Sequence, residues 1–149
     1  MLAIGKRPRR VLSPANIAHA EAMPFPAPNE LSLLESKSLL RQVAEFGDPL
    51  PHLILTGGDP LCRTDLYELI DYARSLGLEV SITPSATPAL TEHALENLKA
   101  HGIQSLGLSL DGSNAERHDG IRAVPGCFER TITALNYQFK SILSITRYL

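Results

Sequence analysis

The sequence is poor in cysteine and has no tryptophan, and the shortage of cysteine excludes several classes of protein. Cys62 and Cys127 are the only cysteines in 149 residues, and neither belongs to a C-x-x-C pair. Two cysteines so far apart indicate neither a disulfide framework nor a metal site. Unpaired cysteines are typical of a reducing compartment, so the sequence predicts a cytoplasmic protein.

Strong charge and long apolar runs are also lacking. The net charge is −2 at pH 7, which gives no electrostatic basis for binding nucleic acid. No run approaches the roughly 18 consecutive apolar residues of a transmembrane helix, so we expect no contact with a membrane. A G-x-G-x-x-G loop and a Walker A loop, the two commonest phosphate-binding motifs, are both absent. What remains is the composition of one globular domain, with 44% hydrophobic residues.

The chain divides into three parts. Residues 1–28 are basic and rich in proline, and we expect them to form an irregular, poorly ordered lead-in. A transit peptide would also be basic, but Pro8 and Pro14 argue against the amphipathic helix that it needs. Residues 29–135 are the expected ordered core, and residues 136–149 are interpreted as a truncated tail.

Within the core, helical patterns alternate with short apolar runs. Strands are predicted at His52–Thr56, Glu79–Thr83 and Ser105–Leu110. Helices are predicted from Ser32, from about Thr64, from about Leu90 and from Cys127 or Phe128, with only a short helical turn at Asn114–His118. This alternation predicts an α/β fold of right-handed βα units, with parallel strands and helices outside. Three clear strands indicate part of a (β/α) barrel or a small doubly wound sheet.

The apolar run Leu53–Leu55 ends at two glycines and a carboxylate, Gly57-Gly58-Asp59. Large aliphatic residues bounded by turn residues are typical of a strand that is covered on both faces. Glycine has no Cβ, so a ligand can approach the backbone of this turn closely. Ligands of open α/β sheets and barrels bind at the carboxyl ends of the strands, where these glycines fall.

If the three predicted strands are parallel, the loops that follow them emerge at the same edge of the sheet. There they could contact one ligand. The candidate binding residues at this edge are Thr56, Gly57, Gly58, Asp59, Ser85, Ser109, Asp111 and Arg122. Such a set suits a zwitterion that carries sugar hydroxyls, with Arg122 pairing a carboxylate and an acid accepting from an amine or ribose. Three simpler interpretations stay open: Asp59 caps the following helix, Asp111-Gly112 is an ordinary turn, and Arg122 is a solvated surface charge.

These residues resemble the radical S-adenosylmethionine (SAM) enzymes over about residues 29–135. Thr56-Gly57-Gly58-Asp59-Pro60 is similar to their glycine-rich motif, which holds the methionine amino group of SAM. Many members have Glu at the position of Asp59. The resemblance implies a partial barrel, SAM as cofactor, and reductive cleavage of SAM to a 5′-deoxyadenosyl radical.

A second segment resembles one branch of this family, the haem- and peptide-modifying enzymes with a SPASM-type extension. The matching residues are Ser109-Leu110-Asp111-Gly112, Glu116, His118-Asp119, Arg122, Gly126 and Phe128. In that branch the residues at the positions of Ser109 and Arg122 commonly contact the SAM carboxylate.

The sequence departs from the family at the iron–sulfur cluster. Members bind a [4Fe–4S] cluster through C-x-x-x-C-x-x-C, and the corresponding segment Ser13–His19 has no cysteine. Cys62 and Cys127 cannot replace three ligands. We therefore assign no metal ligand and no catalytic residue, and expect the chain alone to be inactive. We interpret it as an internal piece of a larger enzyme, whose barrel a partner chain could complete.

Other functions stay open from the sequence. The chain could be a non-catalytic module that binds SAM or a nucleotide, or a gene remnant without function. An iron-independent enzyme that uses Asp59 and Asp111 as an acid–base pair is a further alternative.

Overall fold

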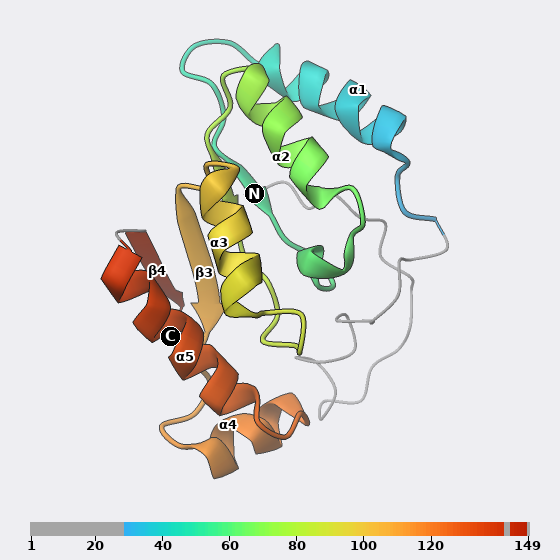
Figure 1. The fold of residues 1–149 in the computed structure, drawn as a ribbon. Coiled ribbons are helices and arrows are strands. Elements are labelled where there is room, and N and C mark those ends of the chain that lie inside the picture. The colour runs from blue at the N-terminus through green and yellow to red at the C-terminus, as the bar shows by residue number, and fades with distance from the viewer. Residues whose placement is uncertain (1–28, 142–143, 149) are drawn as a thin grey trace.

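The computed structural model describes residues 29–141 and 144–148, so the lead-in predicted for residues 1–28 lies outside the described residues. Helices and strands alternate along the chain, as Figure 1 shows. The strands are β1 (Leu53–Leu55), β2 (Val80–Ile82), β3 (Ser105–Ser109) and β4 (Ser144–Tyr148). The helices are α1 (Leu33–Ala44), α2 (Leu66–Ser75), α3 (Glu92–Ala100), α4 (Ala115–Arg122) and α5 (Cys127–Ser141), with a short 3-10 helix η2 (Pro60–Cys62).

The strands form one parallel sheet in the order β1-β2-β3-β4. This arrangement confirms the predicted α/β class, and the open parallel sheet with its helices corresponds to part of a (β/α) barrel. Strand β4 was not predicted, and it pairs with β3 from Ser105↔Ser144 to Ser109↔Tyr148. Helix α5 also runs to Ser141, beyond residue 135, where the predicted core ends. The barrel-like pattern therefore continues into residues that the sequence pattern assigned to a tail.

One face of the sheet is apolar and packs on the helices. Leu53 and Leu55 of β1 lie in one buried cluster with the alternate residues of β2 and β3. Helices α1, α2, α3 and α5 contribute to the same cluster, which places them on this face. The other strand members of the cluster are Val80, Ile82, Leu106 and Leu108.

The opposite face of the sheet carries polar groups near the start of the strands. Ile54, Ser81 and Ser105 lie side by side in the register of β1, β2 and β3. His52 Nε2 lies 2.6 Å from Ser81 Oγ, which lies 2.5 Å from Ser105 Oγ. A chain of hydrogen bonds therefore crosses the sheet on the face opposite to the one that packs on α1, α2, α3 and α5.

The helix boundaries follow local capping. The helix predicted from Ser32 begins there, and Ser32 and Glu35 form a capping box at the start of α1. Helix α4 is longer than the predicted turn: it begins after Asn114, whose side chain accepts from the Arg117 N–H, and it ends at Arg122. None of the described helices is long and apolar enough to cross a membrane.

Candidate functional site

The first loop at the candidate site is the glycine turn after β1. Gly57 has a φ of 121°, which residues with a side chain rarely adopt. A Cβ built at Gly57 would meet no described residue within 4 Å, so the described part of the chain leaves open space beside this backbone. Gly58 is exposed as well. The turn therefore needs glycine for its conformation and leaves its peptide groups within reach of a ligand.

The loop after β2 contacts this turn directly. The Thr83 N–H donates to the Leu55 carbonyl over 2.9 Å, and Ser85 Oγ donates to the Gly58 carbonyl over 3.3 Å. Thr87 Oγ1 donates to Asp59 Oδ2 over 2.5 Å. The structure thus brings the ends of β1 and β2 together, with Ser85 beside the glycine turn.

Asp59 has a structural role in this loop. Its side chain is buried, with 8% of the residue exposed, and Oδ1 accepts from the Leu61 N–H over 3.1 Å. Asp59 is the N-cap of η2, as one of the simpler interpretations proposed. Because both carboxylate oxygens already have protein partners, Asp59 is poorly placed to act in an acid–base pair.

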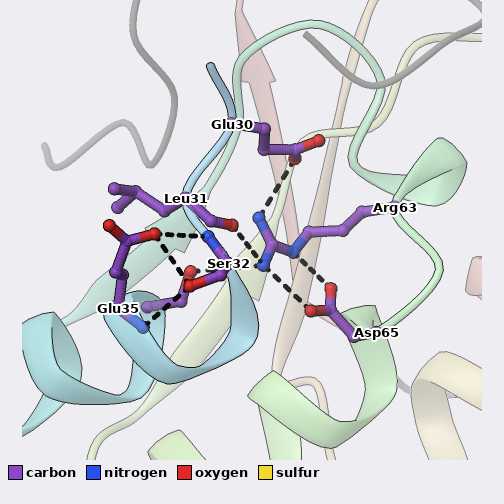
Figure 2. Close-up of polar contacts among 7 residues, drawn as sticks. Glu30, Leu31, Ser32, Glu35, Arg63 and Asp65 are labelled. Atoms are coloured by element: carbon purple, nitrogen blue, oxygen red, sulfur yellow. Dashed lines mark hydrogen bonds and ion pairs between the residues drawn. The ribbon is translucent and has the colours of Figure 1, made fainter. Parts of the chain in front are cut away.

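A cluster around Arg63 anchors the far end of the same loop, and no pattern in the sequence indicated it. Figure 2 shows the guanidinium between the residues before α1 and the start of α2. Arg63 Nε and Nη2 donate to the carboxylate of Asp65 over 2.5 and 3.0 Å, and Nη1 donates to Glu30 over 3.1 Å. Nη2 also contacts the Leu31 carbonyl and Ser36 Oγ. The Arg63 side chain is only 12% exposed, so this cluster fixes the glycine loop to α1.

Asp111, in the loop after β3, and Arg122, the last residue of α4, form an acid–arginine pair. Arg122 Nε donates to Asp111 Oδ2. The side chain of Arg122 is 17% exposed and that of Asp111 is 35% exposed, so Arg122 is not a solvated surface charge. The two Nη atoms of Arg122 have no hydrogen-bond partner among the described residues. Ser109, the last residue of β3, is exposed and lies just before Asp111 in the sequence.

Two adjacent residues of α4 tie the helix to its surroundings. His118 is fully buried, and its Nδ1 accepts from the Asp111 N–H over 3.1 Å. Burial lowers the pKa of His118, with a smaller opposing effect of Asp111. Asp119 accepts from the N–H groups of Gly126 and Phe128 over 2.6 and 2.7 Å, and mainly the Phe128 bond lowers the pKa of this carboxyl. Helix α4 is therefore fixed to β3 on one side and to α5 on the other.

Comparison with known proteins assigns this arrangement to a family. The chain belongs to the radical SAM superfamily, whose family model matches residues 16–146. Members of this family use SAM and a [4Fe–4S] cluster.

Several curated relatives share the same segment. The chain is 42% identical over 118 residues to an AdoMet-dependent heme synthase of Oleidesulfovibrio alaskensis, covering 79% of the chain and 30% of the relative. It is 43% identical over 106 residues to an AdoMet-dependent heme synthase of Methanosarcina barkeri, covering 71% and 30%. A PqqA peptide cyclase of Rhizobium meliloti is 33% identical over 120 residues, covering 80% and 31%. The chain thus spans about a third of the length of these relatives.

The residues of this chain do not fit the iron–sulfur cluster. A [4Fe–4S] cluster is held by cysteine thiolates, and the sequence offers only Cys62 and Cys127. Burial raises the pKa of both thiols, which disfavours the thiolate that a metal needs. Within residues 29–141 and 144–148, no three His, Cys, Asp or Glu side chains are grouped as a metal site would require.

Proposed function

We propose that this chain binds SAM at the carboxyl edge of its sheet, in contact with the glycine turn, Ser85, Ser109 and Arg122. The observation that carries this proposal is the pairing of Arg122, among the described residues, through Nε alone, because no other described residue occupies the Nη edge of its guanidinium. A guanidinium binds a carboxylate through two parallel hydrogen bonds.

The remaining groups suit the other parts of the methionine moiety. Carbonyl oxygens accept two hydrogen bonds, so the Gly58 carbonyl can accept from the SAM ammonium as well as from Ser85. Gly57, with open space around it, allows the ammonium to approach the backbone. Ser109 offers an exposed hydroxyl for the SAM carboxylate. Asp59 holds the turn in place as the N-cap of η2, and Asp111 pairs with Arg122. Thr56, directly before the glycines, remains a proposed contact of SAM.

The chain alone is proposed not to cleave SAM, because its residues do not fit the cluster that supplies the electron. Residues 29–135 form the proposed SAM-binding core. Among the described strands, β1 pairs only with β2, so closing a barrel takes further strands, from this chain or a partner chain. Cys62 and Cys127 are both unpaired, and a reducing cytoplasm is the proposed location.

The binding test is calorimetric titration of SAM into the purified chain, with the iron and sulfide content measured after anaerobic reconstitution. We expect saturable binding of SAM and no stable cluster. Binding should weaken by about tenfold or more in Arg122→Ala, since hydrogen bonds to charged groups contribute about 1.5–3 kcal/mol. Absence of any SAM binding would overturn the proposal. About four irons per chain would instead show that the ligands were wrongly assigned.

We also propose that the complete enzyme, of which this chain forms a part, acts on a tetrapyrrole. The likeness at 42–43% identity to proteins named AdoMet-dependent heme synthase supports this class over a peptide, since the identity to the PqqA peptide cyclase is 33%. The test replaces the matching segment of the Oleidesulfovibrio alaskensis heme synthase with that of this chain. Heme formation by the hybrid is the expected result. A hybrid that cleaves SAM but forms no heme would exclude this substrate class and leave SAM binding intact.

A further inference from the structure

Asp111 contacts both His118 and Arg122, in a way that the proposed ligand contacts do not require. His118 and Arg122 are four positions apart on α4, so they lie one above the other on the same helix face. That face is turned toward the end of β3, because both residues contact Asp111 there. Asp111 thus contacts two residues of α4: its backbone N–H contacts His118, and its carboxylate contacts Arg122.

The backbone contact depends on a very close approach of the loop to the helix. A Cβ built at Gly112 would lie 2.5 Å from the backbone N of His118 and 2.9 Å from the Cβ of Arg117. Only glycine allows the loop to come this near, and the Asp111 N–H then reaches His118 Nδ1 at 3.1 Å. The ring acts through Nδ1 alone, because His118 Nε2 is buried and has no hydrogen-bond partner among the described residues.

The side-chain contact fixes the direction of the guanidinium. Asp111 Oδ2 accepts from Nε of Arg122, which is one edge of the planar group. The end of the group formed by the two Nη atoms is a second edge, and it has no hydrogen-bond partner among the described residues. Because an arginine side chain loses much rotational freedom when it binds, a guanidinium already held in place binds a carboxylate at lower entropic cost.

We infer that Asp111 and His118 are positioning residues, which hold Arg122 with its Nη edge toward the carboxylate of the ligand. This inference rests on the proposed SAM site and changes the part that Asp111 takes in it. Asp111 acts through Arg122 and makes no contact with the ligand amine or ribose. His118 acts one step further away, by fixing the backbone of Asp111 against α4.

Three ligands separate the contributions to binding. SAM has both a carboxylate and an amine, decarboxylated SAM keeps only the amine, and methylthioadenosine has neither. The measurement is the Kd of each ligand for the full chain, by calorimetric titration. Asp111→Ala should weaken SAM about two- to tenfold, the cost of immobilising one long side chain. The same variant should leave decarboxylated SAM and methylthioadenosine unchanged.

Conservative variants distinguish positioning from a general loss of structure. Asp111→Asn keeps an acceptor oxygen for Nε, so it should recover most of the SAM affinity that Asp111→Ala loses. His118→Asn keeps an acceptor near the position of Nδ1 and should bind SAM normally, whereas His118→Leu should resemble Asp111→Ala. Circular dichroism monitors the fold of each variant. If His118→Leu does not fold, the comparison of Asp111→Ala with Asp111→Asn still tests whether Asp111 positions Arg122.

Three results would overturn the inference. Tighter SAM binding in Asp111→Ala would show that Asp111 competes with the ligand for Arg122. An equal loss for SAM and decarboxylated SAM would show that Asp111 contacts the amine itself. Independent, additive losses in the Asp111→Ala/Arg122→Ala double variant would show that the two residues act separately. If the unmodified chain binds none of the three ligands, the proposed function fails before this inference is reached.

Discussion

Thr87, in the loop after β2, donates a 2.5 Å hydrogen bond to the buried carboxylate of Asp59, at the end of the glycine turn after β1. This bond joins two neighbouring strand ends. It also satisfies the carboxylate oxygen that the cap of η2 leaves over, since Oδ1 is already occupied by the Leu61 N–H. The position of the turn therefore depends on a residue that a glycine-rich motif does not include.

The Thr87→Val substitution tests this dependence. Valine keeps the shape of threonine but leaves a buried carboxylate oxygen without its donor, so we expect a loss of about 1–3 kcal/mol in the free energy of unfolding. Urea denaturation measures this loss. Thr64→Val is the matched control, because Thr64 is exposed and should change stability by less than about 0.5 kcal/mol. Equal effects of the two substitutions would contradict the role of Thr87.

Arg63 gives a second prediction, for the other end of the loop. Lysine is a point charge and cannot reproduce the planar contacts of Arg63 with Asp65, Glu30 and the Leu31 carbonyl. Arg63→Lys should therefore lower the free energy of unfolding by about 1–3 kcal/mol. Urea denaturation of Arg41→Lys provides the comparison, because Arg41 is exposed and its guanidinium contacts, within the described part of the chain, only Tyr72 at 3.4 Å. Arg63 would be dispensable if both lysine variants were as stable as the original chain.

Much of the fold could be predicted because its signals are local. Leu53–Leu55 is a run of aliphatic residues beside turn residues, and Ser32 with Glu35 forms a capping box. Strand β4 lacks such a run, and it forms by pairing with β3 far earlier in the chain. Helix α4 has no apolar stripe, since its Ile121 is exposed, and it is held by the contacts of His118 and Asp119.

The candidate site could be predicted only in its parts. Two adjacent glycines in the sequence indicate a turn with a backbone conformation that other residues rarely adopt. The positive φ of Gly57 confirms this. The pairing of Asp111 with Arg122 was not visible, because it depends on how α4 folds back on β3. Arg63 was missed for the same reason: its partners Glu30 and Ser36 lie 33 and 27 positions away.

Two glycines near α4 give opposite predictions for the same substitution. Gly112→Ala places a Cβ 2.5 Å from the backbone of His118, so we expect a loss of stability of about 1–3 kcal/mol. Gly120 lies inside α4, where an added Cβ would meet nothing within 4 Å, and Gly120→Ala should stabilise the helix by about 0.5–1 kcal/mol. Thermal unfolding of both variants checks the pair. A neutral Gly112→Ala would mean that the loop and α4 are not in close contact.

His118, which is buried, and its neighbour Asp119 predict that the fold weakens in acid, in two separate ranges of pH. Burial lowers the pKa of His118 from its ordinary 6.5, so the unfolded chain takes up this proton first and stability falls as the pH drops below about 6.5. Asp111 and Asp119 favour the charged imidazole and Arg122 opposes it, and these are the charges that act on this ring. The Phe128 N–H lowers the pKa of Asp119 from 3.8, so its contribution is lost only below that value.

His118→Asn separates the two ranges, because asparagine keeps an acceptor for the Asp111 N–H and has no proton to gain. Urea denaturation at a series of pH values should show a shallower slope between pH 5 and about 6.5 in this variant than in the original chain. The loss of stability below the ordinary pKa of 3.8 should remain in the variant, because Asp119 is present in both chains. Identical slopes between pH 5 and 6.5 would mean that His118 gains its proton as readily in the folded chain as in the unfolded one. The imidazole would then carry a proton on Nδ1, and its bond to Asp111 could not hold α4 in place.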